Sequence, residues 1–209
     1  FTMYKTILAT ILFSTALHAA PLPISNDTVP QLVEITDINN PVDRQMGDKF
    51  GFGRVEEPYA IGKTEVTNAQ YAAFLNDVAK DDPNQLYDER MATHPRGGIT
   101  RNGQAGSYTY AVIADRAQQP VVFVDLLDAT RYCNWLSTGK TESGVYAIRQ
   151  IERFDDVSIQ PAMRDLNTAP GKRLYFLPNR NQWYKAAYYQ PQTQSYRQYA
   201  NVNVNQPSA

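Results

Sequence analysis

The sequence has very few of the residues that usually form reactive or metal-binding centres. Among its 209 residues there is one cysteine, Cys133, and there are two histidines, His18 and His94. One cysteine cannot form an internal disulfide or a site of several thiolates, and two histidines leave little material for a catalytic triad or a histidine-rich metal centre. The charges nearly cancel, since 20 Lys+Arg stand against 21 Asp+Glu. This balance argues against a protein that coats nucleic acid and against a disordered acidic tail.

A sustained apolar run, Ile7–Phe13, lies close to the N-terminus. It follows Met3 and Lys5 and precedes small residues up to Ala20, which is the order typical of a secretory signal peptide. The run is too short to span a bilayer, because a spanning helix needs about 20 residues. We therefore expect residues 1–19 to be a signal peptide and the protein to be exported, to the periplasm or the extracellular space, with no membrane span in the mature chain. A buried first helix is the alternative interpretation.

The rest of the chain can build a folded core, because 43% of the residues are apolar and 11% are aromatic. Pro21, Pro23 and Pro30 mark residues 20–31 as a linker. We expect one domain over residues 32–209, with two smaller domains as the alternative.

Three segments carry the signals of a helix start. Thr67, with a glutamine three residues later, has the spacing of a capping box, in which each side chain bonds the backbone amide of the other residue. Asp125 and Asn179 are expected to cap two further helices, and Gly139 to end the second. The first helix, expected to end near Lys80, places four apolar residues on one face: Tyr71, Phe74, Leu75 and Val78.

Short strands are expected between and around these helices. The candidates are residues 32–35, the region 59–66 around Gly62, a hairpin over 107–113 after Gly103 and Gly106, and the segments 145–148 and 174–177. Few helices, short strands and long loops predict an α+β domain.

Two residues are candidates for a catalytic role, and for each of them a non-catalytic role is favoured. His94 precedes Pro95 in a loop, where a solvated histidine is commoner than a catalytic one. Cys133 lies on the apolar face of the second helix, beside Tyr132 and Trp135, which favours a buried structural thiol over a nucleophile.

Two charged tracts also stand out. Five acidic residues follow the first helix in a spacing that matches no EF-hand, so a solvated loop is favoured over a calcium site: Asp77, Asp81, Asp82, Asp88 and Glu89. From Leu166 to Ala209 there is no acidic residue, and cations alternate with aromatics. Such a tract could hold single-stranded nucleic acid or an anionic glycan, and export makes nucleic acid the less favoured of the two.

Three segments in order resemble one family. They are Gly62-Lys63-Thr64-Glu65-Val66-Thr67-Asn68-Ala69-Gln70-Tyr71; Pro120–Val124 with Tyr132-Cys133-Asn134-Trp135-Leu136; and Leu177-Pro178 with Trp183-Tyr184-Lys185-Ala186-Ala187-Tyr188. Together they are similar to the formylglycine-generating enzymes, also called sulfatase-modifying factors, over about Leu32–Tyr199. The stretch from Gly97 to Tyr110 resembles an insertion of a secreted bacterial subgroup.

The resemblance implies a loop-rich variant of the C-type-lectin fold with about three helices. It also implies that the family's closing third, with the two cysteines that bind copper, would follow Ala209, so that the chain is C-terminally truncated. Cys133 matches a helix-packing position of the family, and the third helix starts with Asn179-Arg180-Asn181-Gln182 where the family carries acids. No catalytic, cofactor-binding or metal-binding residue is therefore assigned. Copper, with calcium as a second ion, is expected only if the full-length protein follows the family.

The resulting prediction is an exported, non-catalytic binding or structural module. Its partner would be a sulfatase, another exported protein or a surface glycan. The alternative is an oxidase that converts a sulfatase cysteine to formylglycine, with catalytic cysteines beyond residue 209. The missing third is expected to cover the apolar faces that carry Tyr71, Phe74, Trp135 and Trp183, so that the chain alone would be marginally folded.

Overall fold

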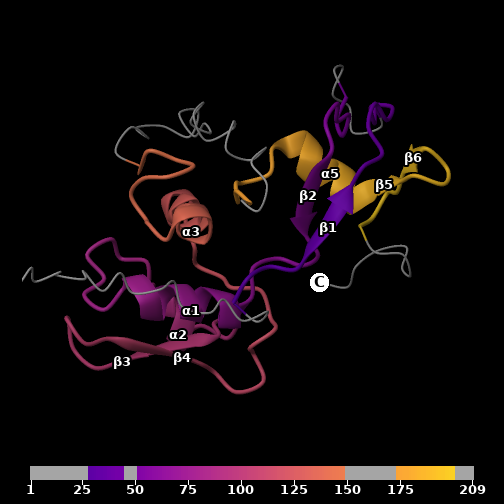
Figure 1. Ribbon diagram of the computed structural model, residues 1–209. Coiled ribbons are helices and arrows are strands. Elements are labelled where there is room, and N and C mark those ends of the chain that lie inside the picture. Colours follow the sequence, from indigo (N-terminus) through magenta and orange to yellow (C-terminus); the bar gives the residue numbers. More distant parts are fainter. Residues whose placement is uncertain (1–27, 45–50, 149–172, 201–209) are drawn as a thin grey trace, which may run out of the picture.

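The computed structural model describes residues 28–44, 51–148 and 173–200 (Figure 1). In chain order the elements are β1 (Leu32–Ile35), β2 (Tyr59–Gly62), α1 (Asn68–Val78), α2 (Arg90–Thr93), β3 (Ile99–Asn102), β4 (Thr109–Val112), α3 (Leu126–Thr138), α5 (Arg180–Tyr188), β5 (Tyr189–Gln190) and β6 (Ser195–Tyr196). The strands pair as three separate antiparallel ribbons, β1–β2, β3–β4 and β5–β6. This mixture confirms the predicted α+β class. The predicted signal peptide and most of the predicted linker lie outside the described residues.

The three predicted helix starts are confirmed. At α1 the Thr67 hydroxyl accepts from the Gln70 amide at 3.3 Å, and the Gln70 side chain accepts from the Thr67 amide at 3.0 Å. Asp125 caps α3 through the Asp128 amide at 2.8 Å, and Gly139 ends it in the left-handed conformation with φ 72°. That conformation carries little penalty for glycine. Local sequence signals were therefore sufficient to place these helices.

The main core lies between α1, α3 and the β3–β4 hairpin. Phe74 is fully buried and packs against Tyr132 and Trp135, with ring centroids 5.4 and 5.3 Å apart. The hairpin closes the other side of α1 through Ile99 and Tyr110, whose hydroxyl donates to the Ala79 carbonyl at 2.7 Å. Large aromatic side chains contribute much of the burial that stabilises such a core.

This packing corrects the expectation that the helix faces lack cover. Tyr71 is 1% exposed, and Phe74 is buried within the described residues themselves. Trp135 also packs on the core and donates its ring N–H to Asp77 at 2.7 Å. Of the four residues in that expectation, only Trp183 is largely exposed, at 53%.

A smaller second core lies on the other side of α3. It contains Cys133, Val145, Tyr146, Ile148 and Leu174. The predicted strands at 145–148 and 174–177 are wrong, because side chains rather than strand ladders take up their backbone groups. Asn134, fully buried, accepts from the Tyr146 amide at 2.7 Å and donates to the Tyr146 carbonyl at 2.9 Å. The Ser137 hydroxyl likewise accepts from the Tyr175 amide at 2.8 Å.

The remaining elements gather around α5, away from the β3–β4 hairpin (Figure 1). Here α5 lies against β1–β2, and the Tyr59 hydroxyl donates to the Gln182 carbonyl at 2.6 Å. The ribbon β5–β6 follows directly after α5, in a stretch where no strand was predicted. The short helix α2 was not predicted either.

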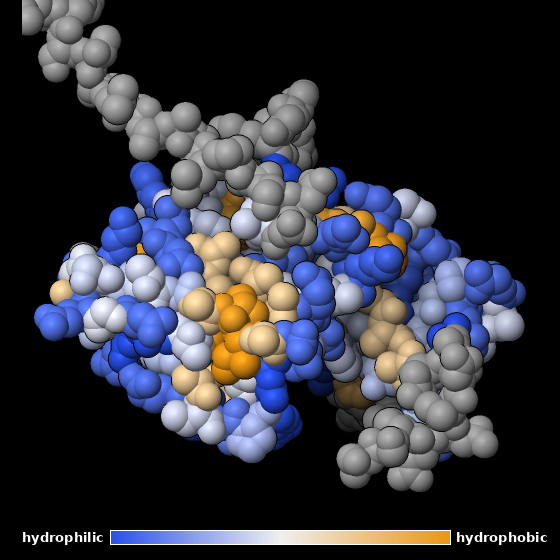
Figure 2. All heavy atoms as spheres, turned by 90° about the horizontal axis from the view of Figure 1, so that it is seen from below, coloured by the Kyte–Doolittle hydropathy of each residue, from blue (hydrophilic) through white to orange (hydrophobic). Residues whose placement is uncertain are grey.

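Figure 2 turns the molecule so that the side of α2 and the β3–β4 hairpin, the lowest elements in Figure 1, faces the viewer. Seen from below, this side is mostly hydrophilic, with apolar residues gathered near its middle (Figure 2). Among the described helices, none combines the length and the apolar character needed to cross a bilayer.

Candidate functional site

The candidate site is a pocket at the start of α5, and its far wall is a loop that pairs with an earlier loop. Asp43 and Phe52 form an isolated antiparallel bridge with N–O distances of 2.8 and 3.0 Å. Asn40, 3% exposed, donates to the Gly53 carbonyl at 2.7 Å and accepts from the Val55 amide at 3.2 Å. The buried amide side chain of Asn40 therefore fixes the backbone of this loop at Gly53 and Val55.

Tyr196 of β6 fixes the same loop from the other side. The Asn40 amide donates to the Tyr196 hydroxyl at 2.6 Å, and that hydroxyl donates to the Pro41 carbonyl at 2.9 Å. Gly53 has φ +86°, and a Cβ at this position would overlap the Tyr196 hydroxyl. Glycine is thus needed here both for the backbone conformation and for the close approach of the ring.

The first turn of α5 forms the near wall. Asn179 caps the helix by accepting from the Gln182 amide at 2.9 Å, as predicted. The next residue but one, Asn181, accepts from the Gly53 amide at 3.1 Å and so ties the two walls together. The Asn179 side chain thus occupies the Gln182 amide, and the Asn181 side chain occupies the Gly53 amide.

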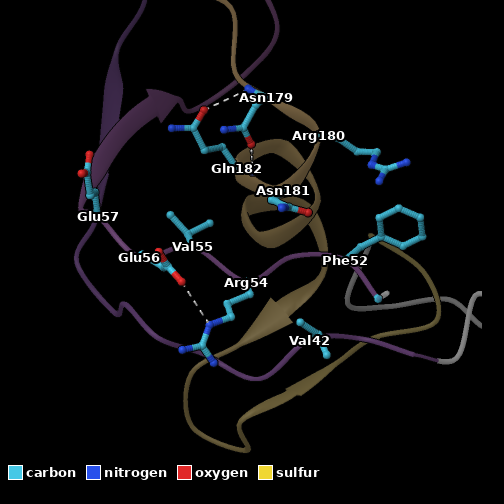
Figure 3. A pocket seen from close by; sticks show the side chains of 11 residues that line it. Val42, Phe52, Arg54, Val55, Glu56, Glu57, Asn179, Arg180, Asn181 and Gln182 are labelled. Atoms are coloured by element: carbon cyan, nitrogen blue, oxygen red, sulfur yellow. Dashed lines mark hydrogen bonds and ion pairs between the residues drawn. The ribbon is translucent and has the colours of Figure 1, made fainter. Parts of the chain in front are cut away.

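The pocket between these walls has a volume of about 600 Å³. Its lining residues are Val42, Gly51, Phe52, Arg54, Val55, Glu56, Glu57, Asn179, Arg180, Asn181 and Gln182. Figure 3 shows Asn181 in the middle of the view, with Arg180 and Phe52 to one side and Arg54, Glu56 and Glu57 to the other. Ligand pockets in proteins have about 300–1,000 Å³, so this one is large enough for a small molecule or part of a chain.

The charged groups of the pocket are balanced. Arg54 Nε lies 3.7 Å from Glu56 Oε1, and both side chains are exposed. The Arg180 guanidinium lies 4.1 Å from the centre of the Phe52 ring, as a cation–π contact. Two arginines and two glutamates therefore line one opening with little net charge.

A row of aromatic rings continues from Phe52 along α5. Tyr184 lies 5.8 Å from Phe52 and 4.7 Å from Tyr188, and Tyr188 lies 6.0 Å from Trp183. Arg180, Tyr184 and Tyr188 follow at four-residue steps, which places them on one face of the helix. We call Phe52, Tyr184, Tyr188 and Trp183 the aromatic row.

The residues that the sequence singled out lie elsewhere. Cys133 is 7% exposed in the second core, where burial raises the pKa of its thiol to about 12. His94 lies half-buried in the loop after α2, where its ring packs edge-on against Phe123 at 5.1 Å and its Nδ1 accepts from the Arg96 amide. Neither residue lines the pocket.

In the acidic tract Asp77, Asp81 and Glu89 are exposed, and Asp82 is the one residue that is buried. Asp82 is 7% exposed and accepts from the amides of Leu86 and Tyr87 at 2.8 and 3.2 Å. Arg101 pairs with both Asp82 and Glu89. Asp82 and Glu89 therefore help to hold the segment between α1 and β3 together.

The described residues do not suit copper. Copper(I) prefers thiolates, and the one cysteine is a buried thiol whose raised pKa keeps it protonated at neutral pH. Within the three described stretches, no group of three or more His, Cys, Asp or Glu side chains could hold a metal ion.

One sequence feature, the start of the third helix, coincides with the pocket. Asn179-Arg180-Asn181-Gln182 departs from the acids that the resemblance implies, and it was interpreted only as a helix cap. The structure shows that all four residues line the pocket. Gly51 and Phe52 line the opposite wall.

A comparison with protein families agrees with the resemblance. The family model for the sulfatase-modifying factor enzyme 1-like domain matches residues 51–208. The chain belongs to this family. No curated protein and no solved structure matched the chain. The α+β arrangement of this sulfatase-modifying-factor domain is consistent with the C-type-lectin-like fold that the resemblance implied.

Proposed function

We propose that the sulfatase-modifying-factor domain of this chain is a non-catalytic binding module of an exported protein, with the pocket at the start of α5 as its binding site. The observation that carries this proposal is the position of Cys133. The single cysteine is enclosed by Val145, Tyr146 and Leu174 in the second core. Its thiol has neither the exposure nor the low pKa of a reactive cysteine.

Family membership favours one alternative, the conversion of a sulfatase cysteine to formylglycine. That reaction would need the two cysteines of the family's closing third, beyond residue 209. Within this chain no residue can take their place, since Cys133 is alone and the pocket contains no sulfur or imidazole. Copper, and calcium as a second ion, belong to this alternative.

The location and the partner form part of the proposal. The basic, apolar and small-residue order of the N-terminus supports export to the periplasm or the extracellular space. The partner would then be an exported sulfatase, another exported protein or a surface glycan, and nucleic acid is not expected. Sequencing the N-terminus of secreted protein should find Ala20 or a close neighbour first, whereas a retained Met3 would contradict removal of the leader.

The test of the proposed function is an assay for the aldehyde product. The chain is incubated with copper(I), oxygen and a sulfatase-type cysteine peptide, and a peptide with serine in place of cysteine serves as the control. Mass spectrometry should find no formylglycine. Product that depends on the peptide cysteine would overturn the non-catalytic role.

A further inference from the structure

The side chains that line the pocket combine donors and acceptors without an excess of either charge. Asn179, Asn181 and Gln182 are amides, which carry both a donor and an acceptor. Glu57 adds acceptors and Arg180 adds donors, and both are exposed at the pocket. A ligand with several hydroxyl groups suits this lining, because each hydroxyl can both donate and accept.

The Phe52 wall adds an apolar surface beside these polar groups. Arg180 covers one part of the ring at 4.1 Å, and Tyr184 packs at its side. The ring is therefore held in a fixed orientation while it still lines the pocket. A sugar ring has an apolar face of C–H groups and an edge of hydroxyls, so it matches an aromatic wall next to amides and carboxylates.

The aromatic row offers a second contact outside the pocket. Trp183 is 53% exposed, one of three large apolar side chains that are exposed among the described residues. It is joined to Phe52 through Tyr188 and Tyr184. Exposed aromatic rings beside adaptable amides are typical of binding surfaces, because they give a large contact area at low entropic cost.

Charge decides between a neutral and an acidic ligand. The cations of the acid-free tract do not gather at the pocket: Arg173 pairs with Glu34 at 3.6 Å, and Lys185 is 3% exposed. Arg54 is opposed by Glu56, and Arg180 and Glu57, of opposite charge, lie at opposite ends of the pocket in Figure 3. An anionic glycan or an acidic peptide would gain little attraction here.

We propose that the pocket between Phe52, Arg180 and Asn181, together with Trp183, binds a neutral saccharide of two or more units. This inference rests on the proposed function and names the ligand class of the same site. The first unit lies in the pocket against Phe52, and the next unit lies along the aromatic row toward Trp183.

The experiment uses the full chain and two sets of probes. Neutral oligosaccharides of hexoses and N-acetylhexosamines are compared with uronic acid oligosaccharides and an acidic peptide, by calorimetry and by tryptophan fluorescence. A neutral oligosaccharide should bind, change the Trp183 emission, and keep its affinity when the salt concentration is raised, because no net charge is neutralised.

Three variants locate the site. Arg180→Ala and Trp183→Ala should each weaken binding about tenfold, the loss that corresponds to one aromatic contact. Arg90→Ala is the matched control, because Arg90 is also exposed and lies 4.7 Å above a phenylalanine ring, that of Phe123, far from the pocket. It should leave the affinity unchanged.

The outcomes separate this inference from the proposed function. Binding of acidic probes alone, with an affinity that falls as salt rises, would overturn the neutral saccharide and leave the binding module in place. Absence of binding to every probe, or equal losses in Arg90→Ala and Arg180→Ala, would overturn the assignment of the pocket. Formylglycine in the aldehyde assay would instead overturn the proposed function.

Discussion

Helices α1 and α5 begin with the same kind of cap but are held in the fold by different forces. Six of the 11 residues of α1 are buried, whereas Lys185 is the one buried residue among the nine of α5. Apolar packing therefore holds α1 in place. By contrast, α5 is held by separate polar contacts, from Tyr59 to the Gln182 carbonyl, from the Gly53 amide to Asn181, and from the Tyr184 hydroxyl to Asp43 at 2.7 Å.

The difference explains why the pocket lies at α5. A helix whose side chains fill a core leaves no room for a ligand, whereas a helix held by a few polar contacts can keep its first turn open. Both regions contain a buried atom without a hydrogen-bond partner among the described residues, Asn68 Oδ1 in α1 and, in α5, the Lys185 Nζ amine. Burial lowers the pKa of this amine, although Asp37 acts in the opposite direction. Most buried polar atoms in folded proteins have a hydrogen-bond partner, so such an atom is tolerated only where other contacts fix the position of its side chain.

The difference between α1 and α5 is tested most strongly by removing one aromatic ring from each of these two helices. Phe74→Ala should lower the free energy of unfolding by about 3–5 kcal/mol, because it leaves a cavity in the main core. Trp183→Ala should change it by less than about 0.5 kcal/mol, because the ring is on the surface. Urea denaturation measures both, and equal losses would mean that the two regions are not held differently.

The buried amides give the next largest effect. Asn40→Ala should cost about 1–3 kcal/mol, because the Gly53 carbonyl and the Val55 amide lose their partner. Hydrogen exchange should lose protection at residues 51–55 and stay unchanged in β3–β4. Asn134→Ala serves as the matched control, with a similar cost that appears at Tyr146 instead. Lost protection in the β3–β4 hairpin of Asn40→Ala would show that the regions are coupled.

A smaller effect is expected at the second core. Cys133→Ala should cost on the order of 1 kcal/mol, as a small buried group is lost. In the native chain the thiol should resist alkylation at pH 8 and react only on unfolding, because its pKa is raised to about 12. Rapid labelling of the folded chain would contradict its burial.

A dependence of stability on pH is expected at the start of α3. Burial, with Asp125 nearby, raises the pKa of Asp128 to about 6, above its usual value of 3.8. The folded state then binds a proton more tightly than the unfolded state, so the free energy of unfolding should fall as the pH rises from about 4 to about 6. Asp128→Asn should reduce this slope and be the more stable form at pH 7. Parallel curves for the two proteins would show that another group titrates.

The sequence predicted the parts of the fold that depend on neighbours along the chain. Thr67, Asp125 and Asn179 were identified as caps because each bonds a residue three positions away. The strands expected at 145–148 and 174–177 failed because α3 side chains, which no local pattern reveals, occupy their backbone groups.

The pocket could not be predicted for the same reason. Its walls depend on Asn40, Gly53, Asn181 and Tyr196, which come from four separate segments. The sequence does not reveal that Asn181 accepts a hydrogen bond from the Gly53 amide, because the two residues are 128 positions apart. Periodicity and spacing within one segment carry no information about that contact.

The bond between Asn40 and Tyr196 joins residues 156 positions apart. Closing so long a loop costs entropy before any contact is gained, and long-range contacts of this kind form late and slow folding. The α1–α3 core can form from a continuous stretch of chain, whereas the pocket wall stays open until Tyr196 arrives. Binding competence should therefore appear after the core has folded, and only once Tyr196 has joined Asn40.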